Sequence, residues 1–475
     1  MNVFLFHRDL RIIDNTALVK APKPITPLFI FTEEQIDPSK NKYFSHAAVQ
    51  FLCESLEDLH NQIKGGLNIL HGYGNTLDQL MLVHSRTPIA SITQNRDFSV
   101  YAKQRDKMIS QWCEKQIPQI VFNNYEDYDL VGEQELLLND NRAYTVLAAY
   151  YNRFIKEDAV KPIVTTKIST AAWSNSSHHQ LSTIRSSGLS TLSKLYEPNM
   201  SIAQHGGRRN GLKQLKKLTK LFLDKYDHDR NYPALFESTS QLSAHLKFGT
   251  ISVRELYWTI VKEARTKDHP FIRELVFRSF YIKMCIARPG LQRSESFRQD
   301  IDNNIPWLKR SDASYAKRWK AWTEGTTGFP LVDAGMRQLN ATGWMHGRVR
   351  MVVATVLTRY FLIDWRDGAR YFATKLVDYD PCSNNMGWQF SAALGENAQN
   401  IYRAPMNPFL QAKTYDNNAE YIKKWVPELA YVSPKQIHTG TWDVVATKYQ
   451  RPIVDQKEAS RKAVTLWKAA ASGKS

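Results

Sequence analysis

The first 125 residues alternate short apolar runs with amphipathic stretches, and this rhythm constrains the fold more than any other feature of the chain. Segments long enough for helices, such as residues 47–63 and 100–115, separate the runs. Such alternation is typical of parallel strands joined by crossover helices. The apolar runs are residues 3–6, 27–31, 67–70, 89–92 and 120–122. We therefore predict an α/β domain with a doubly wound parallel sheet over residues 1–130.

Beyond residue 205, apolar residues recur at helical spacing instead. Two sets each predict one face of a helix: Leu212, Leu215, Leu218, Leu221 and Phe222, and then Val349, Val352, Val353, Val356, Leu357 and Tyr360. We expect a larger all-α domain over residues 205–475. A stretch rich in Ser and Thr around residues 169–193 predicts a surface connection within an interdomain segment, residues 131–204.

The positive charge is confined to the second part of the chain. Residues 1–200 hold 20 basic and 21 acidic side chains, whereas residues 201–475 hold 43 and 25. A field of this sign attracts polyanions, and nucleic acid is the commonest one inside cells. Basic and aromatic side chains also alternate around Trp319, Trp322 and Trp344, a pattern suited to stacking on nucleobases. The alternative is a solvated, lysine-rich surface.

Several classes of protein are disfavoured. The four cysteines lie far apart, without a CxxC pair, so we expect neither a disulfide framework nor a metal site. No run of about 18 apolar residues could span a membrane, and we expect a soluble intracellular protein. The α/β part has neither GxGxxG nor a P-loop, and thus no signature of those nucleotide sites.

Three dense clusters of polar and aromatic residues stand out in the second half, because a helical domain does not need them in order to pack. They are residues 239–243, 274–281 and 378–388. Hydroxyls and backbone N–H groups at a helix start, as in the first cluster, can bind a pyrophosphate. The alternative is an ordinary N-cap, the commoner use of Ser and Thr before a helix.

These clusters belong to a series of motifs through which the sequence resembles the cryptochrome/photolyase family, and within it the class I cyclobutane pyrimidine dimer photolyases. The resemblance spans nearly the whole chain and starts with Phe6-His7-Arg8-Asp9-Leu10-Arg11. The most specific motifs are residues 325–337, Gly343-Trp344-Met345-His346, Ile363-Asp364-Trp365-Arg366 and residues 378–388. The order of the motifs is that of the family.

The resemblance implies a folded-back FAD in the helical domain. The residues implied to hold its phosphates are Tyr226, Thr239, Ser240, Gln241, Leu242 and Ser243. Asp378, Asp380 and Asn384 would line the rest of the cofactor, with Asn384 facing flavin N5. Arg350 beside Asp378 would place a cation near the flavin, which favours the anionic reduced form. The alternative is that Arg350 and Asp378 form a structural ion pair. Such a pair is compatible with a role of Arg350 near the flavin.

Three tryptophans match the family's electron relay from the protein surface to photoexcited oxidised flavin: Trp388, Trp365 and Trp307. Indoles suit this role because they are oxidisable and stable in a core. Without the resemblance, we would interpret three tryptophans this far apart as core packing.

The implied activity is that of a deoxyribodipyrimidine photo-lyase, a carbon–carbon lyase that splits a flipped-out cyclobutane pyrimidine dimer in UV-damaged DNA. The residues implied to contact the DNA and its lesion are Glu274, Phe277, Arg278, Tyr281, Gly347, Met351, Phe390 and Gln411. Glu274 would hydrogen-bond a thymine edge. An exposed helix carboxylate is its alternative role.

Three positions depart from the photolyase pattern. Phe277 and Phe390 replace the usual tryptophans, and Gly347 replaces the usual asparagine. The main alternative is therefore a cryptochrome-type blue-light receptor with FAD photoreduction and little or no repair. A (6-4) photolyase is disfavoured because only His346 of the expected histidine pair is present. Retention of Asn384, Trp388 and Glu274 also disfavours a light-independent DNA-binding protein.

The family often carries a second, antenna chromophore of folate or deazaflavin type near the domain junction. Residues 99–106 occupy the expected region, but Tyr101 and Ala102 do not resemble the Asn-Glu pair of folate-binding members. The sequence leaves the identity of any second chromophore open, and a folate would be held weakly. We expect a monomer.

Overall fold

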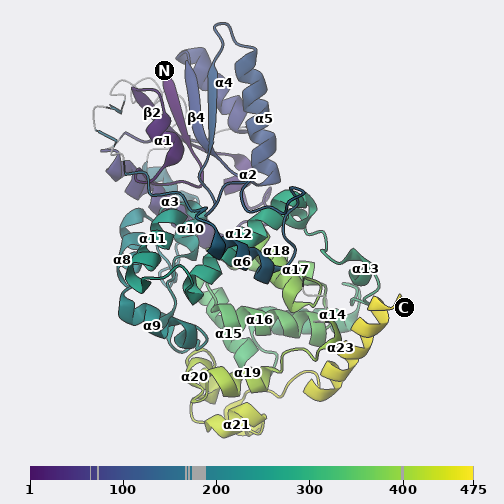
Figure 1. The fold of residues 1–475 in the computed structure, drawn as a ribbon. Coiled ribbons are helices and arrows are strands. Elements are labelled where there is room, and N and C mark those ends of the chain that lie inside the picture. The colour runs from purple at the N-terminus through teal and green to yellow at the C-terminus, as the bar shows by residue number, and fades with distance from the viewer. Residues whose placement is uncertain are drawn as a thin grey trace.

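The structure, a computed structural model, describes residues 1–64, 66–71, 74–165, 168–169, 172–173, 189–396 and 401–473. An α/β domain lies at one end of the molecule and a larger helical domain at the other, as predicted (Figure 1). Most of the predicted surface connection around residues 169–193 lies outside the described residues. Within the described part of the chain, no helix has the length and apolar character needed to cross a membrane.

All paired strands of the α/β domain are parallel, in the order β3-β2-β1-β4-β5. The strands are β1 (Asn2–Phe6), β2 (Ile25–Phe31), β3 (Asn68–His71), β4 (Ser91–Arg96) and β5 (Val121–Glu126). Each overlaps one of the predicted apolar runs. Because β1 pairs with β2 on one side and β4 on the other, the chain winds outward in both directions from the centre. The sheet is therefore doubly wound, as the sequence predicted.

Helices cover both faces of the sheet, so alternate residues of β1 enter two different cores. Phe4 and Phe6 pack on one face with Phe51. Leu5 packs on the other face with Leu80. The helices of this domain are α1 (Thr16–Lys20), α2 (Glu33–Ile36), α3 (His46–Gln62), α4 (Thr76–Arg86) and α5 (Val100–Glu114).

The rest of the described chain is helical. The interdomain segment contains α6 (Leu147–Lys156) and the short helix η2 (Leu189–Lys194). The first helices of the helical domain are α8 (Arg208–Lys216), α9 (Lys220–Asp229), η3 (Phe236–Ser238), α10 (Ser243–Phe248), α11 (Val253–Ala264), α12 (Pro270–Ala287) and η4 (Pro289–Arg293). The next are α13 (Gln299–Asp302), α14 (Ala313–Glu324), α15 (Pro330–Thr342), α16 (Gly347–Thr355), η5 (Val356–Tyr360), α17 (Trp365–Lys375) and α18 (Pro381–Ser391). The last are α19 (Pro408–Tyr415), α20 (Glu420–Trp425), η7 (Pro427–Leu429), α21 (Pro434–Thr439), α22 (Val444–Thr447) and α23 (Gln456–Ala471).

One predicted helix face is confirmed and the other is wrong. All six apolar residues of the face between Val349 and Tyr360 are buried along α16 and η5. The face that begins at Leu212 is instead divided between α8 and α9. Thr219 caps the second helix by accepting the N–H of Phe222 at 3.4 Å, and Leu221 is 67% exposed. An N-cap in the middle of the pattern thus interrupts a continuous helical periodicity.

The prediction that Trp322 and Trp344 stack on nucleobases is also wrong, because both indoles are buried in the helical core. Trp322 donates from Nε1 to the carbonyl of Val353 at 3.1 Å. Trp319 is half-buried and stacks on Trp322 with a centroid distance of 5.6 Å. Lys320, which lies between Trp319 and Trp322 in the sequence, is exposed on the outer side of a helix whose aromatic side faces inward.

A buried cluster of ion pairs joins the two domains, and we call it the boundary cluster. Arg254 of α11 contacts Asp14 at 3.0 Å and Asp127 at 2.7 Å. Arg11 pairs with Asp127 from the α/β side. All four side chains are buried. Their charges cancel, which is what burial of ionised groups requires.

Candidate functional site

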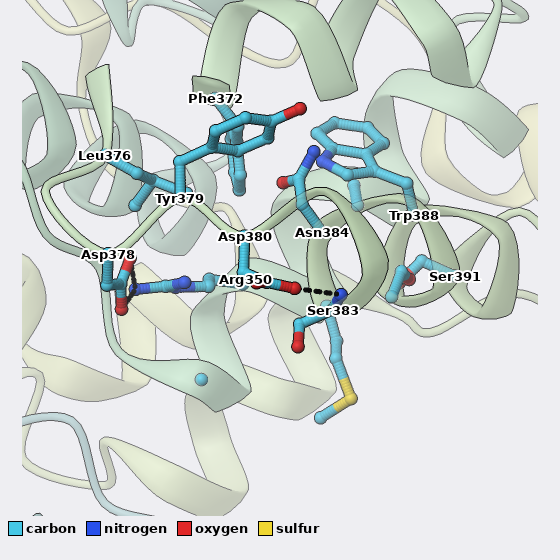
Figure 2. Close-up of a pocket in the computed structure, with 14 residues that line it drawn as sticks. Arg350, Phe372, Leu376, Asp378, Tyr379, Asp380, Ser383, Asn384, Trp388 and Ser391 are labelled. Carbon is cyan, nitrogen blue, oxygen red and sulfur yellow. Dashed lines mark hydrogen bonds and ion pairs between the residues drawn. The ribbon is translucent and has the colours of Figure 1, made fainter. Parts of the chain in front are cut away.

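A central cavity with two lobes lies in the helical domain beneath the carboxyl ends of the strands. The inner lobe has a volume of about 210 Å³ and contains Asn384 and Trp388 (Figure 2). The outer lobe has a volume of about 310 Å³ and contains Tyr226 and Glu274. The lobes share four lining residues, namely Arg350, Asp378, Asp380 and Ser383. A ligand that fills both lobes must therefore pass these four side chains.

Arg350 and Asp378 form an ion pair at this junction. Arg350 approaches the two carboxylate oxygens at 3.0 and 3.2 Å, and its Nε donates to the carbonyl of Met345 at 2.8 Å. Figure 2 shows the guanidinium beside Asp378, with dashed lines that mark the ion pair. The two residues are therefore in contact, as predicted. The pair fixes a cation at the point where the two lobes meet.

Asp380 has a structural and an electrostatic role at the same junction. As N-cap of α18, it accepts the N–H groups of Cys382 and Ser383, each at 3.1 Å. Arg8, which follows β1, contacts its other oxygen at 2.9 Å. Burial would raise the pKa of Asp380, but Arg8 and Arg278 outweigh this effect and lower it. The carboxylate is ionised, and the cavity is built by both domains.

Arg8 and Lys247 line the outer lobe, although the sequence analysis assigned neither of them to the site. Burial, and then repulsion by Arg8, lowers the pKa of Lys247 to about 8. No carboxylate lies within ion-pairing distance of Lys247 in the described part of the chain; its ammonium instead lies over the rings of Phe248 and Tyr379. Arg8 falls inside the first family motif, Phe6-His7-Arg8-Asp9-Leu10-Arg11, which was the available signal for it.

The predicted phosphate residues divide into two groups. Tyr226, Ser240, Leu242 and Ser243 line the outer lobe. The side chains of Thr239 and Gln241 instead donate to the carbonyl of Phe236, at 3.4 and 3.2 Å. The N-cap of α10 is Leu242, which offers no side-chain acceptor, and the Ala244 N–H donates to Gln204 at 3.2 Å. The Ser and Thr hydroxyls therefore do not serve as the N-cap of this helix.

In the inner lobe, the amide of Asn384 lies beside the indole of Trp388 (Figure 2). Asn384 donates from Nδ2 to the carbonyl of Ala369 at 3.1 Å, which fixes the amide. Its carbonyl oxygen receives no hydrogen bond from any described residue. Trp388 packs directly on Gly368 of α17, where a Cβ atom would lie 2.2 Å from the indole. The glycine allows the tryptophan to lie between α17 and the cavity.

The other two tryptophans of the predicted relay meet at one carboxylate. Trp307 donates from Nε1 to Asp302 at 3.0 Å, and Trp365 approaches the other oxygen of Asp302 at 3.5 Å. Trp365 is fully buried, whereas Trp307 is half-buried and touches Trp467 of the C-terminal helix. The structure thus brings Trp307 and Trp365 together. Their role in electron transfer remains a prediction.

Four of the predicted DNA contacts reach the cavity. Glu274 lines the outer lobe at an exposed position and pairs with Arg230. Arg278 also lines this lobe, but its guanidinium donates to the carbonyl of Tyr128 at 3.2 Å, toward the other domain. Gly347 and Met351 line the inner lobe. A Cβ atom added at Gly347 would meet nothing within 4 Å.

The other four predicted contacts do not line the cavity in the described part of the chain. Phe277 and Phe390 are half-buried. Tyr281 is buried and makes an edge-to-face contact with Phe277 at 4.9 Å. The buried Oε1 of Gln411 accepts no hydrogen bond from a described residue. The structure therefore does not place these four side chains with the other predicted contacts.

Together the two lobes fit FAD. The outer lobe offers hydroxyls from Ser240 and Ser243 and the ammonium of Lys247, which suit a diphosphate. The inner lobe is largely apolar and is lined by Trp388, by Asn384 with its free amide oxygen, and by the cation of Arg350. The fold and the site thus define a two-domain flavoprotein with its cofactor inside the helical domain.

The comparisons with known proteins agree with this class. Residues 2–166 match the family described as DNA photolyase, and residues 271–469 match the FAD binding domain of DNA photolyase. A deoxyribodipyrimidine photo-lyase of Alkalihalophilus pseudofirmus is 31% identical over 98% of this chain and 97% of its own. The chain belongs to the DNA photolyase family, a family of DNA-repair enzymes, and FAD is its cofactor.

Two solved structures show the same fold. An archaeal photolyase from Sulfolobus tokodaii with two FAD molecules is 33% identical, with a TM-score of 0.82 over 98% of this chain and 99% of that one. A cryptochrome from Synechocystis is 22% identical, with a TM-score of 0.83 over 98% of this chain and 99% of that one. The second likeness extends to the fold alone.

Proposed function

We propose that this protein repairs cyclobutane pyrimidine dimers in UV-damaged DNA with the energy of blue light. The observation that carries the proposal is the continuity of the cavity from Asn384 and Trp388 to the exposed carboxylate of Glu274. A lesion at the opening would lie next to a flavin in the inner lobe. Reduced FAD, when bound, supplies the photoexcited electron that opens the cyclobutane ring.

The chain's own residues would hold and tune the cofactor. Ser240, Ser243 and Lys247 would bind the diphosphate in the outer lobe. Arg350 would stabilise negative charge on the reduced flavin, because a fixed cation lowers the energy of a nearby anion. The carbonyl oxygen of Asn384 would accept a hydrogen bond from the flavin edge without adding charge of its own.

The lesion would enter from the outer side. A dimer is poorly stacked and therefore costs little to flip out of the duplex. Glu274 would accept a hydrogen bond from a pyrimidine edge while Arg230 holds the carboxylate in place. Met351 would form part of the apolar wall. The basic surface of the helical domain would bind the phosphates of the strand.

Gly347 favours a second candidate function, that of a blue-light receptor with little repair. The space beside its Cα is open, so a polar contact to the lesion made from this position in other photolyases is missing here. Phe277 and Phe390 also lack the indole N–H of the usual tryptophans. The diphosphate of FAD would be bound in the same way in both functions, because none of these three residues lines the outer lobe in the described structure.

One experiment separates the two functions. Chemically reduced protein is illuminated with blue light in the presence of an oligonucleotide with a single thymine dimer, and restored thymine is measured by chromatography. A dark sample and a (6-4) lesion serve as controls. We expect repair of the cyclobutane lesion only in the light. Bound, photoreducible FAD without repair would overturn the proposal, and a light receptor would then be favoured.

The variant Gly347→Asn sharpens this experiment. A Cβ atom at this position would meet nothing within 4 Å, so the start of the side chain is accommodated and the variant tests the missing polar contact. We expect it to raise affinity for the dimer about 3- to 10-fold, the effect of one hydrogen bond. Gly347→Leu is the control, since it fills the same space without a polar group. Equal affinities for both variants would exclude a polar contact at this position.

A second cavity of about 190 Å³ lies in the α/β domain among α2, α4 and α5, and we propose that it holds a second chromophore. Tyr101 and Arg105 line it, from the segment that the sequence analysis placed at an antenna site. The Sulfolobus tokodaii relative, with two FAD molecules, shows that the fold can hold a second flavin. Chromatography of chromophores released from purified protein tests this. A flavin-to-protein ratio near one, with no other pigment, would contradict it.

A further inference from the structure

A second series of aromatic rings leads from the cavity to the edge of the helical domain, apart from Trp365 and Trp307. Trp388 meets Trp322 at a centroid distance of 6.0 Å. Trp322 stacks on Trp319 at 5.6 Å, and Trp319 stacks on Tyr315 at 6.1 Å. Three of these four residues come from α14, at positions three or four apart, so one face of a single helix carries the series.

The contacts of this series are closer than those of the predicted relay. Trp388 makes ring contacts with Trp322 and Phe372, but none with Trp365 in the described part of the chain. The guanidinium of Arg366 also lies 4.7 Å from the centre of the Trp365 ring. A fixed cation there opposes formation of a tryptophan radical cation, although the carboxylate of Asp302 offsets part of this effect.

The last ring of the series has a proton acceptor. Tyr315 is 8% exposed, and its hydroxyl donates to Asp367 Oδ2 at 2.9 Å. The other oxygen of Asp367 pairs with Arg310 at the surface. An oxidised phenol is a strong acid, so a carboxylate at hydrogen-bond distance can take its proton as the electron leaves. A tyrosine in this setting ends an electron relay with a neutral radical.

We propose that Trp388, Trp322, Trp319 and Tyr315 form a second electron-transfer route to the flavin, which ends in proton-coupled oxidation of Tyr315. Trp388 gives one electron to photoexcited oxidised FAD, and Trp322 refills Trp388. Trp319 then reduces Trp322, and Tyr315 reduces Trp319. The phenolic proton passes to Asp367 Oδ2. One electron reaches the flavin, and one neutral tyrosyl radical remains for reduction by a thiol in solution.

Tyr371 provides a matched control within the same cluster. Its ring touches Trp322 at 5.4 Å and Trp319 at 5.8 Å, as close as that of Tyr315. Its hydroxyl, however, donates to the amide oxygen of Asn340 at 2.7 Å and to a backbone carbonyl. Neither group is basic enough to take a proton. Tyr371 should therefore stay reduced although it lies on the same rings.

The test is electron paramagnetic resonance of the full FAD-loaded chain, frozen under blue light, with and without ring-deuterated tyrosine. We expect a tyrosyl radical whose signal narrows on deuteration. The signal should disappear in Tyr315→Phe and persist in Tyr371→Phe. Asp367→Asn should lower its yield about 10-fold, because the acceptor loses its charge while its shape is kept. Flavin content and melting temperature of each variant establish that it is folded.

A second measurement compares the two routes by photoreduction of the oxidised flavin. Trp365→Phe should retain a measurable rate, and Trp365→Phe combined with Trp319→Phe should lose it. The proposal is overturned if Trp365→Phe alone is as inactive as Trp388→Phe, or if no tyrosyl radical forms, or if its signal survives in Tyr315→Phe. The samples in both measurements contain no DNA. The inference therefore depends on bound FAD and not on which lesion is repaired.

Discussion

The boundary cluster and the central cavity both place charged side chains in the interior, but they differ in how these charges are matched. The boundary cluster has two cations, Arg11 and Arg254, and two carboxylates, Asp14 and Asp127, and each of the four forms at least one ion pair within the cluster. The cavity is lined by four cations, Arg8, Lys247, Arg278 and Arg350, and three carboxylates. Lys247 among them has no carboxylate partner in the described structure.

The comparison shows that buried charge alone does not mark a functional site. A cluster whose charges cancel holds two domains together and has nothing left to bind a ligand. A cluster with an excess cation and open space beside it is incomplete without an anion. The two phosphate groups of FAD would supply the missing negative charge. The excess charge, and not the burial, identifies the binding site.

The largest effect on stability is expected when an ion pair of the boundary cluster is broken. Arg254→Met removes the cation but keeps much of the volume, and leaves Asp14 and Asp127 short of a partner in the interior. Loss of one member of a buried pair costs about 3–5 kcal/mol of unfolding free energy. Chemical denaturation followed by circular dichroism measures it. A cost below about 1 kcal/mol would mean that water reaches the cluster, and our distinction between the two sites would fail.

Arg350→Gln should act mainly on cofactor binding. The variant removes the cation at the junction of the two lobes, where Asp378 would then repel a reduced flavin. We expect affinity for FAD to fall about 10- to 100-fold, the range for one charged hydrogen bond of about 1.5–3 kcal/mol. Fluorescence titration of the cofactor-free chain measures it. Arg337→Gln is a control, because Arg337 pairs with Glu428 away from the cavity.

Lys247 is expected to make two properties depend on pH in opposite directions, namely the stability of the cofactor-free protein and its affinity for FAD. Its pKa lies near 8 in the folded chain, below the ordinary 10.5. Between these values the unfolded chain binds more protons, so the unfolding free energy of the cofactor-free protein rises with pH. Affinity for FAD should fall over the same pH range as the ammonium is lost. Lys247→Met should remove both trends, and a melting temperature of the wild-type apoprotein that falls from pH 8 to 10 would contradict this assignment.

The smallest effect is expected at the open side of the cavity. Gly347→Ala adds a methyl group that meets nothing within 4 Å, and it lies at the start of α16. A compatible Gly→Ala change stabilises a protein by about 0.4–1 kcal/mol through the unfolded state. Thermal unfolding should show a rise of that size. The matched change Gly335→Ala should destabilise, because its Cβ atom would lie 2.4 Å from Val349.

The sequence predicted those parts of the molecule that depend on local pattern. The strands followed from short apolar runs, and the junction of Arg350, Asp378 and Asp380 followed from family motifs. The division between α8 and α9 was missed because Thr219 interrupts a periodicity that is otherwise continuous. The burial of Trp322 was missed because charge and aromatic content do not reveal which side of a helix faces the core.

The contribution of Lys247 to the cavity could not be predicted for a different reason. A buried lysine can bind an anionic ligand when no carboxylate of the protein pairs with its ammonium. Whether such a carboxylate is near depends on which distant segments the fold brings together. The same holds for Tyr315 and Asp367, which are 52 residues apart. Sequence motifs identify residues that a family retains, but not which of them remain unsatisfied in the folded chain.

Arg8, which completes the cavity from the α/β domain, has a consequence for how the protein matures. Its partner Asp380 lies 372 residues later in the chain, and the inner-lobe residue Trp388 follows in the same helix. During synthesis, Arg8 would leave the ribosome long before the residues that complete the cavity with it. The cavity therefore cannot be complete until both ends of a long stretch of chain have folded and met.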